Sequence, residues 1–340
     1  MKKSELLRVA IALFLVAILT LTIHQFRSTG SSTADFPIRQ VAISEKLVDV
    51  HVEEGSTGSE IAAQLFKLGI IESSQSFFKV AVSDVRAARI APGIHQLNNK
   101  IAATQALEQL LDPTRIPNLI KIFEGGWNTE IFKALEQNGF VQVDILKAAK
   151  EVQLPQGFTS LEGVLYPAQY SFTKETTAKQ ALEAMINRFT QQVGDLGLSS
   201  DPKLKAQELI IIASIIQAEG DVKDFSKISQ VIRNRLRIGM PLQMDSTVHY
   251  VKKVRGNVFL STQSTLLKSP FNTYRKYGLP PAPIGNPGLD AIKAAINPAD
   301  GKWLYFITVS PGDTRFTAEI SEFNQWKVLY TKNRKAGAFK

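Results

Sequence analysis

The N-terminal segment constrains this chain most, because it contains a stretch suited to lipid rather than to water. Residues 9–23 carry no charged side chain, and Lys2, Lys3 and Arg8 precede them. The apolar stretch 9–26 is about the shortest helix that can cross a hydrocarbon core of ~30 Å. No A-x-A type cleavage site follows, so we predict an uncleaved anchor, with a removed signal peptide as the alternative.

The basic flank predicts the orientation of the anchor. Positively charged flanks stay in the cytoplasm, so the chain after Phe26 is expected on the outer side of the cytoplasmic membrane, as the bulk of a single-pass protein. The formal charge is +9, from 40 Lys and Arg against 31 Asp and Glu. Such a charge suits nucleic acid, anionic lipid or an acidic polymer. Export argues against nucleic acid and favours lipid or wall polymers.

A strand–turn–helix pattern occurs twice, at residues 48–70 and 118–140. Each copy has a strand, an acidic-glycine turn, a capped helix and a glycine stop. Two copies are too few for a solenoid. The paired positions are Glu54 and Glu124, Gly55 and Gly125, Glu60 and Glu130, Ile61 and Ile131, Leu65 and Leu135, and Gly69 and Gly139.

These patterns predict an α+β protein in which a transmembrane helix precedes a small α/β module and a larger, mostly helical domain. The expected parts are residues 1–29 (cytoplasmic tail and anchor), 30–46 (linker), 47–115 (first module) and 116–340 (main domain, opened by the second module at 116–145). Helices are expected at 73–89, 177–193, from about 202 to 219, 226–238 and 289–297, and a strand at 303–309.

Several kinds of chemistry have no support in the sequence. There is no Walker A motif, no GxGxxG after a strand, no HExxH and no GxSxG. The chain lacks cysteine, and its four histidines (His24, His51, His95 and His249) have no ligand spacing. We therefore predict no metal and no cofactor. A Ser-His-Asp triad through His249 has no support either.

The stretch ELIIIASIIQAEGD, residues 208–221, places an acid at the end of a strongly aliphatic helix. One turn before Glu219 lie Ile215 and Ile216, so the carboxyl is expected over an apolar surface that raises its pKa. Gly220 is expected to end the helix, whose C-terminal dipole disfavours negative charge. A protonated carboxyl near neutral pH is what a general acid requires. The alternative is a solvated helix-end glutamate.

Four stretches carry a family resemblance. ASIIQAEG, VIRNRLRIGMPLQMDSTVHY, SPFNTYRKYGLPPAPIGNPG and the upstream LEGVLYPAQYSF are similar to the endolytic murein transglycosylase (YceG-like) family. The resemblance covers essentially the whole chain, and residues 47–112 match that family's LysM-like module. This chain has RFT (315–317) and EFN (322–324) where relatives often read HxFS and EHN.

The resemblance implies cleavage of the β-1,4 bond between N-acetylmuramic acid and N-acetylglucosamine inside a peptidoglycan strand, leaving a 1,6-anhydro end. It places the catalytic glutamate on Glu219, with Gln217 where relatives carry an acid. An anchored enzyme of this kind is expected to act on nascent glycan, close to the peptidoglycan synthases.

Polar residues after the Glu219 helix are candidates for positioning the sugars. They are Gln243, Ser246, Thr247, Asn272 and Tyr274, although Asn272 could equally cap a turn. Glu162 and Asp245 are interpreted as structural or cleft-shaping acids. Arg233, Arg235 and Arg237 could meet peptide-stem carboxylates, or form a solvated helix face.

Two other functions fit the same sequence. A non-catalytic, membrane-anchored scaffold would bind glycan with both modules and make Glu219 incidental. A hydrolase would activate water with a second carboxylate, Asp221 or Glu162, and release reducing ends.

Overall fold

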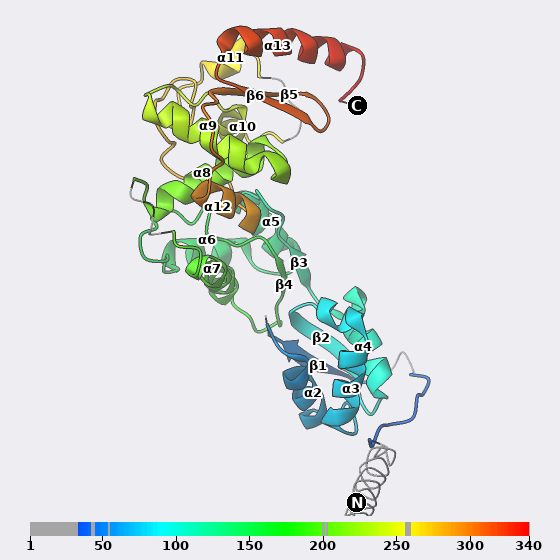
Figure 1. Ribbon diagram of the computed structural model, residues 1–340. Coiled ribbons are helices and arrows are strands. Elements are labelled where there is room, and N and C mark those ends of the chain that lie inside the picture. Colours follow the sequence, from blue (N-terminus) through cyan, green and yellow to red (C-terminus); the bar gives the residue numbers. More distant parts are fainter. Residues whose placement is uncertain are drawn as a thin grey trace, which may run out of the picture. The chain divides into compact units, whose positions relative to one another are not determined.

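The computed structural model describes residues 33–41, 45–53, 55–198, 201, 203–255 and 260–339, and divides into two compact units, Met1–Ile116 and Pro117–Lys340 (Figure 1). Helices and two-stranded antiparallel sheets make up both units, which confirms the α+β class. The expected anchor, residues 1–29, lies outside the described residues. Within the described part, no helix is long and apolar enough to cross a membrane.

The first unit is a βααβ module with one added helix. Its β1 and β2 pair antiparallel, with Val50 opposite His95. Alternate β1 residues Val50 and Val52 point into a core that also holds Leu65 and Phe77. The elements are β1 (Leu47–Val52), α2 (Gly58–Lys67), α3 (Ser74–Ser83), η1 (Val85–Arg89), β2 (Gly93–Asn98), α4 (Ala103–Leu111) and η2 (Pro113–Arg115).

The helix expected over residues 73–89 is two helices, so that prediction was wrong. Asp84 has an extended backbone between α3 and η1. Its carboxylate accepts a hydrogen bond from Arg86 N at 2.9 Å. A short acidic side chain that caps the following turn competes with helix continuation, which the apolar periodicity did not reveal.

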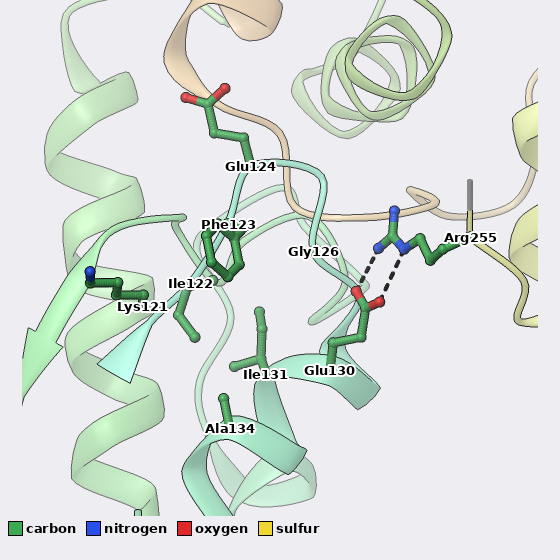
Figure 2. A pocket seen from close by; sticks show the side chains of 9 residues that line it. All are labelled: Lys121, Ile122, Phe123, Glu124, Gly126, Glu130, Ile131, Ala134 and Arg255. Carbon is green, nitrogen blue, oxygen red and sulfur yellow. Dashed lines mark hydrogen bonds and ion pairs between the residues drawn. The ribbon is translucent and has the colours of Figure 1, made fainter. Parts of the chain in front are cut away.

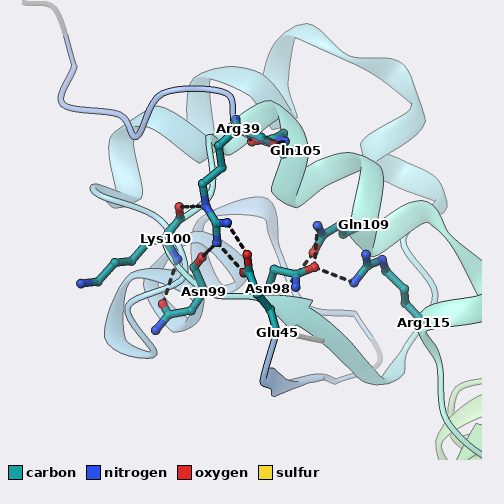
Figure 3. A network of polar contacts seen from close by, with 8 residues as sticks. All are labelled: Arg39, Glu45, Asn98, Asn99, Lys100, Gln105, Gln109 and Arg115. Atoms are coloured by element: carbon teal, nitrogen blue, oxygen red, sulfur yellow. Dashed lines mark hydrogen bonds and ion pairs between the residues drawn. The ribbon is translucent and has the colours of Figure 1, made fainter. Parts of the chain in front are cut away.

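Part of the expected linker is packed on the first unit (Figure 3). The Arg39 guanidinium donates to Lys100 O at 3.1 Å and to Asn99 O at 2.7 Å, and pairs with Glu45 at 2.7 Å. The Asp35 carboxylate accepts from Ala103 N at 3.0 Å, which satisfies the start of α4. Residues 33–41 are therefore part of the module's surface rather than a free tether.

The second unit has a core built around α8. Residues 209–216 of this helix are all buried, because its faces pack against α9, α10 and α12. The elements are β3 (Leu119–Lys121), α5 (Asn128–Gln137), α6 (Gln142–Glu151), β4 (Gln169–Ser171), α7 (Ala178–Gly194), α8 (Ala206–Glu219), η3 (Val222–Asp224), α9 (Phe225–Arg237), α10 (Asp245–Lys252), α11 (Thr262–Thr265), α12 (Leu289–Ile296), β5 (Tyr305–Ser310), β6 (Asp313–Thr317) and α13 (Ile320–Lys335).

The repeat seen in the sequence is a repeat of fold. In the second copy β3, α5, α6 and β4 follow the order of β1, α2, α3 and β2, and β3 pairs antiparallel with β4. Gly55 and Gly125 have φ of 80° and 74°, a conformation that favours glycine in the same turn of both copies. The second module therefore extends beyond residue 145, as far as β4.

Candidate active site

The helix α8 ends at Glu219, as the sequence predicted. Gly220 follows it, but not with the left-handed backbone that is common after a helix. Gly220 has φ of −155°, which is extended backbone open to any residue. A Cβ on Gly220 would lie 2.3 Å from Ile228 Cδ1 of α9. A side chain at this position would require the Ile228 side chain to move, so glycine suits the close packing of α9 and is not required by a left-handed backbone.

Glu219 is a half-buried residue at the end of α8, and desolvation affects its carboxyl strongly. Burial among apolar groups raises its pKa, and the negative charge of Asp245 acts in the same direction. The nearby Ser246 hydroxyl and backbone N–H act in the opposite direction. The balance favours a protonated carboxyl.

The start of α10 faces this carboxyl. The Ser246 N–H donates to Glu219 Oε1 at 3.0 Å. It belongs to the first turn of α10, where free N–H groups favour negative charge. The C-terminal end of α8 favours the protonated form of Glu219, while the N-terminal end of α10 favours its ionised form. Glu219 is thus placed to give up a proton and to take it back.

Two of the candidate sugar-binding residues, Thr247 and Asn272, are fully buried. Thr247 Oγ1 donates to Met244 O at 2.7 Å. Asn272 Nδ2 donates to Thr265 O and Leu267 O, both at 2.9 Å. Both side chains hold the backbone of the loops beside α10. Burial argues against direct contact with a ligand and for a supporting role.

Of the other candidates, Ser246 and Tyr274 lie near Glu219. Tyr274 is half-buried, and its hydroxyl donates to the Asp245 carboxylate. Gln243 is exposed and has φ of 49°, a strained backbone held by its N–H donating to Thr273 O at 3.1 Å. Ser246 Oγ is buried and close to Glu219, but it is not aligned for a hydrogen bond with any described residue. Their contact with a sugar stays a prediction.

Two of the three arginines of α9 have structural partners in other segments, whereas Arg237 is exposed. Arg235 is buried, and its Nε donates to Leu304 O at 2.6 Å. Arg233 pairs with Asp201 at 2.9 Å and donates to Ala295 O at 2.7 Å. Neither forms a solvated face, and neither guanidinium is free to meet a stem carboxylate.

Glu162 belongs to a buried polar network that the sequence indicated only as a structural acid. Its carboxyl is 8% exposed and accepts from Asn128 N and from the Tyr250 hydroxyl, both at 2.9 Å. Burial raises its pKa to about 7. Asn286 Oδ1 accepts from Gly163 N and Leu165 N, both at 2.9 Å, and so ties this segment to the loop before α12.

The Glu162 network reaches the site through α10. Tyr250 of α10 contacts Glu162, and Ser246 of the same helix contacts Glu219. The network thus positions the helix whose first turn faces the acid. Across the described ranges, no group of three or more His, Cys, Asp or Glu side chains is arranged to hold a metal ion.

Comparisons with known proteins find similar sequences over most of the chain. The model of the YceG-like family matches residues 50–328. An endolytic murein transglycosylase of Bacillus subtilis is 29% identical over 318 residues, covering 86% of this chain and 88% of that protein. One from Streptococcus pneumoniae is 27% identical over 86% of this chain, which spans only 57% of that relative.

A solved structure is similar in fold. It is that of a YceG-like protein from Listeria monocytogenes, with a TM-score of 0.56 at 24% identity. The likeness covers 82% of this chain and 98% of the other.

Proposed function

Because this chain belongs to the YceG-like family, we propose that it is an endolytic lytic transglycosylase of peptidoglycan. It cleaves the β-1,4 bond between N-acetylmuramic acid and N-acetylglucosamine within a strand and leaves a 1,6-anhydro end. One observation carries the proposal: Glu219 is a half-buried acid whose carboxyl also receives the Ser246 N–H at 3.0 Å.

The proposed reaction needs one carboxyl group. Glu219 gives its proton to the glycosidic oxygen as the bond from that oxygen to the muramic C1 breaks. The C6 hydroxyl of the same muramic residue then attacks C1 and returns its proton to Glu219. An intramolecular nucleophile has an effective concentration that a bound water lacks. The products are an anhydro end and a free hydroxyl end, and the enzyme is unchanged.

The surroundings of Glu219 support both halves of this cycle. Burial favours the protonated form before bond cleavage, and the Ser246 N–H stabilises the carboxylate that follows. Glu162 is buried, and its carboxyl accepts hydrogen bonds from Asn128 N and the Tyr250 hydroxyl inside the protein, which leaves it poorly placed to activate water. This favours the single-acid cycle over a hydrolase that uses Glu162.

We also propose the cellular setting that the sequence predicts. The N-terminal segment anchors the chain in the cytoplasmic membrane, with the two units on the outer side. The substrate is then nascent glycan close to the synthases. Protease protection of the intact chain in sealed vesicles tests the orientation, and extraction by carbonate without detergent would contradict the anchor.

Glu219→Gln tests the catalytic role, with Glu162→Gln as the matched carboxyl control. We expect Glu219→Gln to lower the release of anhydro ends by at least ~100-fold, the usual contribution of a general acid. Glu162→Gln keeps an amide in the buried network and retains most of the activity. Mass spectrometry of digested strands measures both, since an anhydro end is one water lighter than a reducing end.

Four outcomes separate the alternatives. Anhydro ends released by Glu219→Gln at the parent rate would overturn the catalytic role of Glu219. No anhydro ends from the parent protein, with glycan still bound, would leave the scaffold function. Reducing ends from the parent protein would show a hydrolase. Loss of activity in both variants, with unchanged melting temperatures, would make Glu162 a second essential acid and contradict the single-acid cycle.

A further inference from the structure

The turn between β3 and α5 opens into a pocket of about 410 Å³ (Figure 2), within the ~300 to 1,000 Å³ typical of ligand sites. It lies in the second βααβ module and includes no residue assigned to the reaction. Apolar side chains and one ion pair line it: Ile122, Phe123, Ile131 and Ala134 with Glu130 and Arg255. The Phe123 side chain is 75% exposed, which is unusual for a large aromatic ring.

The first module has different residues at the positions that form this pocket. The repeat pairs Phe123 with Glu53 and Ala134 with Gln64. The second copy therefore has an aromatic ring where the first has a carboxylate, and a methyl group where the first has a long amide. Both changes make the surface apolar, and the smaller Ala134 leaves room. The turn and helix are otherwise alike, so the pocket is a local addition to the second copy.

One wall of the pocket is held by Arg255. Its Nε donates to Glu130 Oε1 at 3.0 Å, and its guanidinium lies 3.8 Å from the centre of the Trp127 ring. Glu130 Oε2 also accepts from Trp127 N at 2.7 Å. These contacts fix the Glu130 carboxylate, whose remaining lone pairs can accept from hydroxyl groups.

The charges around the pocket cancel. Lys121 and Arg255 carry two positive charges, and Glu124 and Glu130 two negative charges. A neutral rim with an apolar floor suits an uncharged, partly apolar ligand. A peptide with several carboxylates would find no excess of positive charge here.

The pocket is joined to the helix that carries the acid. A Cβ on Gly125, in the turn, would lie 3.2 Å from Gln217 Cγ. Gln217 is two residues before Glu219, and its Oε1 accepts from Gly288 N at 2.9 Å. A ligand held at this turn is therefore bound to the same rigid body as the catalytic glutamate.

We infer that this pocket binds one N-acetylhexosamine residue of the glycan, away from the bond that is cleaved. The inference rests on the proposed function for its ligand. The Phe123 ring stacks on the apolar face of the sugar, and the acetamido methyl group packs on Ile131 and Ala134. Sugar hydroxyls donate to Glu130. The site lengthens the strand that the enzyme grips and adds nothing to the chemical step.

The test uses the full-length protein carrying Glu219→Gln, labelled at its isoleucine methyl groups, with hexa-N-acetylchitohexaose as the probe. We expect the NMR signals of Ile122 and Ile131 to shift. Ile61, the first-module counterpart of Ile131, reports any separate binding there. Ala134→Gln, which copies the first module and fills the pocket, and Phe123→Ala should each weaken binding at Ile131 about tenfold or more, or ~1.4 kcal/mol.

Matched controls exclude a general effect. Glu53→Ala alters the first-module counterpart of Phe123 and should leave the shift at Ile131 unchanged. Signals of Ile122 and Ile131 that do not move, or that move equally in Ala134→Gln, would overturn the inference. A shift caused by a sugar-free stem pentapeptide in place of the oligosaccharide would also overturn it. If Glu219→Gln still cleaves peptidoglycan while the sugar shifts Ile131, the pocket stands and the proposed catalysis fails.

Discussion

The two βααβ modules share a local structure but differ in what they support. Leu65 and Leu135 occupy the same helix position and are both fully buried. Leu65 packs in a core made by the first unit alone, whereas Leu135 belongs to the core that contains α8. Local sequence therefore determines the module, while the elements that pack on its outer faces determine its role. The second copy belongs to the core that supports the site, whereas the first forms a core of its own.

The largest expected effect comes from replacing the leucine that the two modules share. Leu65→Ala and Leu135→Ala should each destabilise their own unit by about 2–5 kcal/mol, since each leaves a cavity in a closed core. Calorimetry should show that each lowers a different unfolding transition. Only Leu135→Ala should also reduce cleavage of peptidoglycan, because its core holds α8. Equal loss of activity in both variants would contradict the conclusion that only the second module supports the site.

The stability of the two units should respond to pH in opposite directions. Burial raises the pKa of Glu162 to about 7, from 4.5 in the unfolded chain. The folded second unit therefore binds more protons, and this stability is fully present below pH 4.5 and is lost as pH rises to about 7. The loss is at most about 3.5 kcal/mol. Glu162→Gln should remove this contribution to the pH dependence of the free energy of unfolding, measured by urea denaturation at several pH values.

The first unit should show the reverse dependence. His95 is fully buried with Nε2 bonded to Ala91 O at 2.7 Å, and burial lowers its pKa below 6.5. Its contribution is present above pH 6.5 and is lost as the pH falls through the lowered pKa. His95→Gln should flatten this dependence. If the stability of both units changed with pH in the same direction, Glu162 and His95 would not be the groups responsible.

The smallest effect concerns the shared turn glycine. Gly55→Ala and Gly125→Ala each place a side chain at positive φ and should cost ~1–2 kcal/mol. Gly55 has open space around its missing Cβ, whereas the Cβ at Gly125 would press on Gln217 at 3.2 Å. We therefore expect a larger loss of thermal stability, and a lower cleavage rate, for Gly125→Ala alone. Identical melting temperatures for the two variants would argue against the contact.

Near-neighbour patterns explain what could be predicted. The periodicity of β1 and α2, the end of α8 at Glu219 and the two glycine turns depend on residues within a few positions of one another. The same patterns failed at Asp84, where a single side-chain cap interrupts an apolar run. They also missed the pocket, although the change from Gln64 to Ala134 between the two copies was a visible signal.

Local sequence is enough to specify the repeated module, the aliphatic helix and the acid at its end, because hydrophobic period and capping act along a few turns of chain. Folding of the whole unit is needed to bring the Ser246 N–H to Glu219, to place Asn286 against Gly163 and to bury Thr247. Those contacts join segments 27 and 123 residues apart in two of these cases. They form when a whole core closes, so no local pattern encodes them.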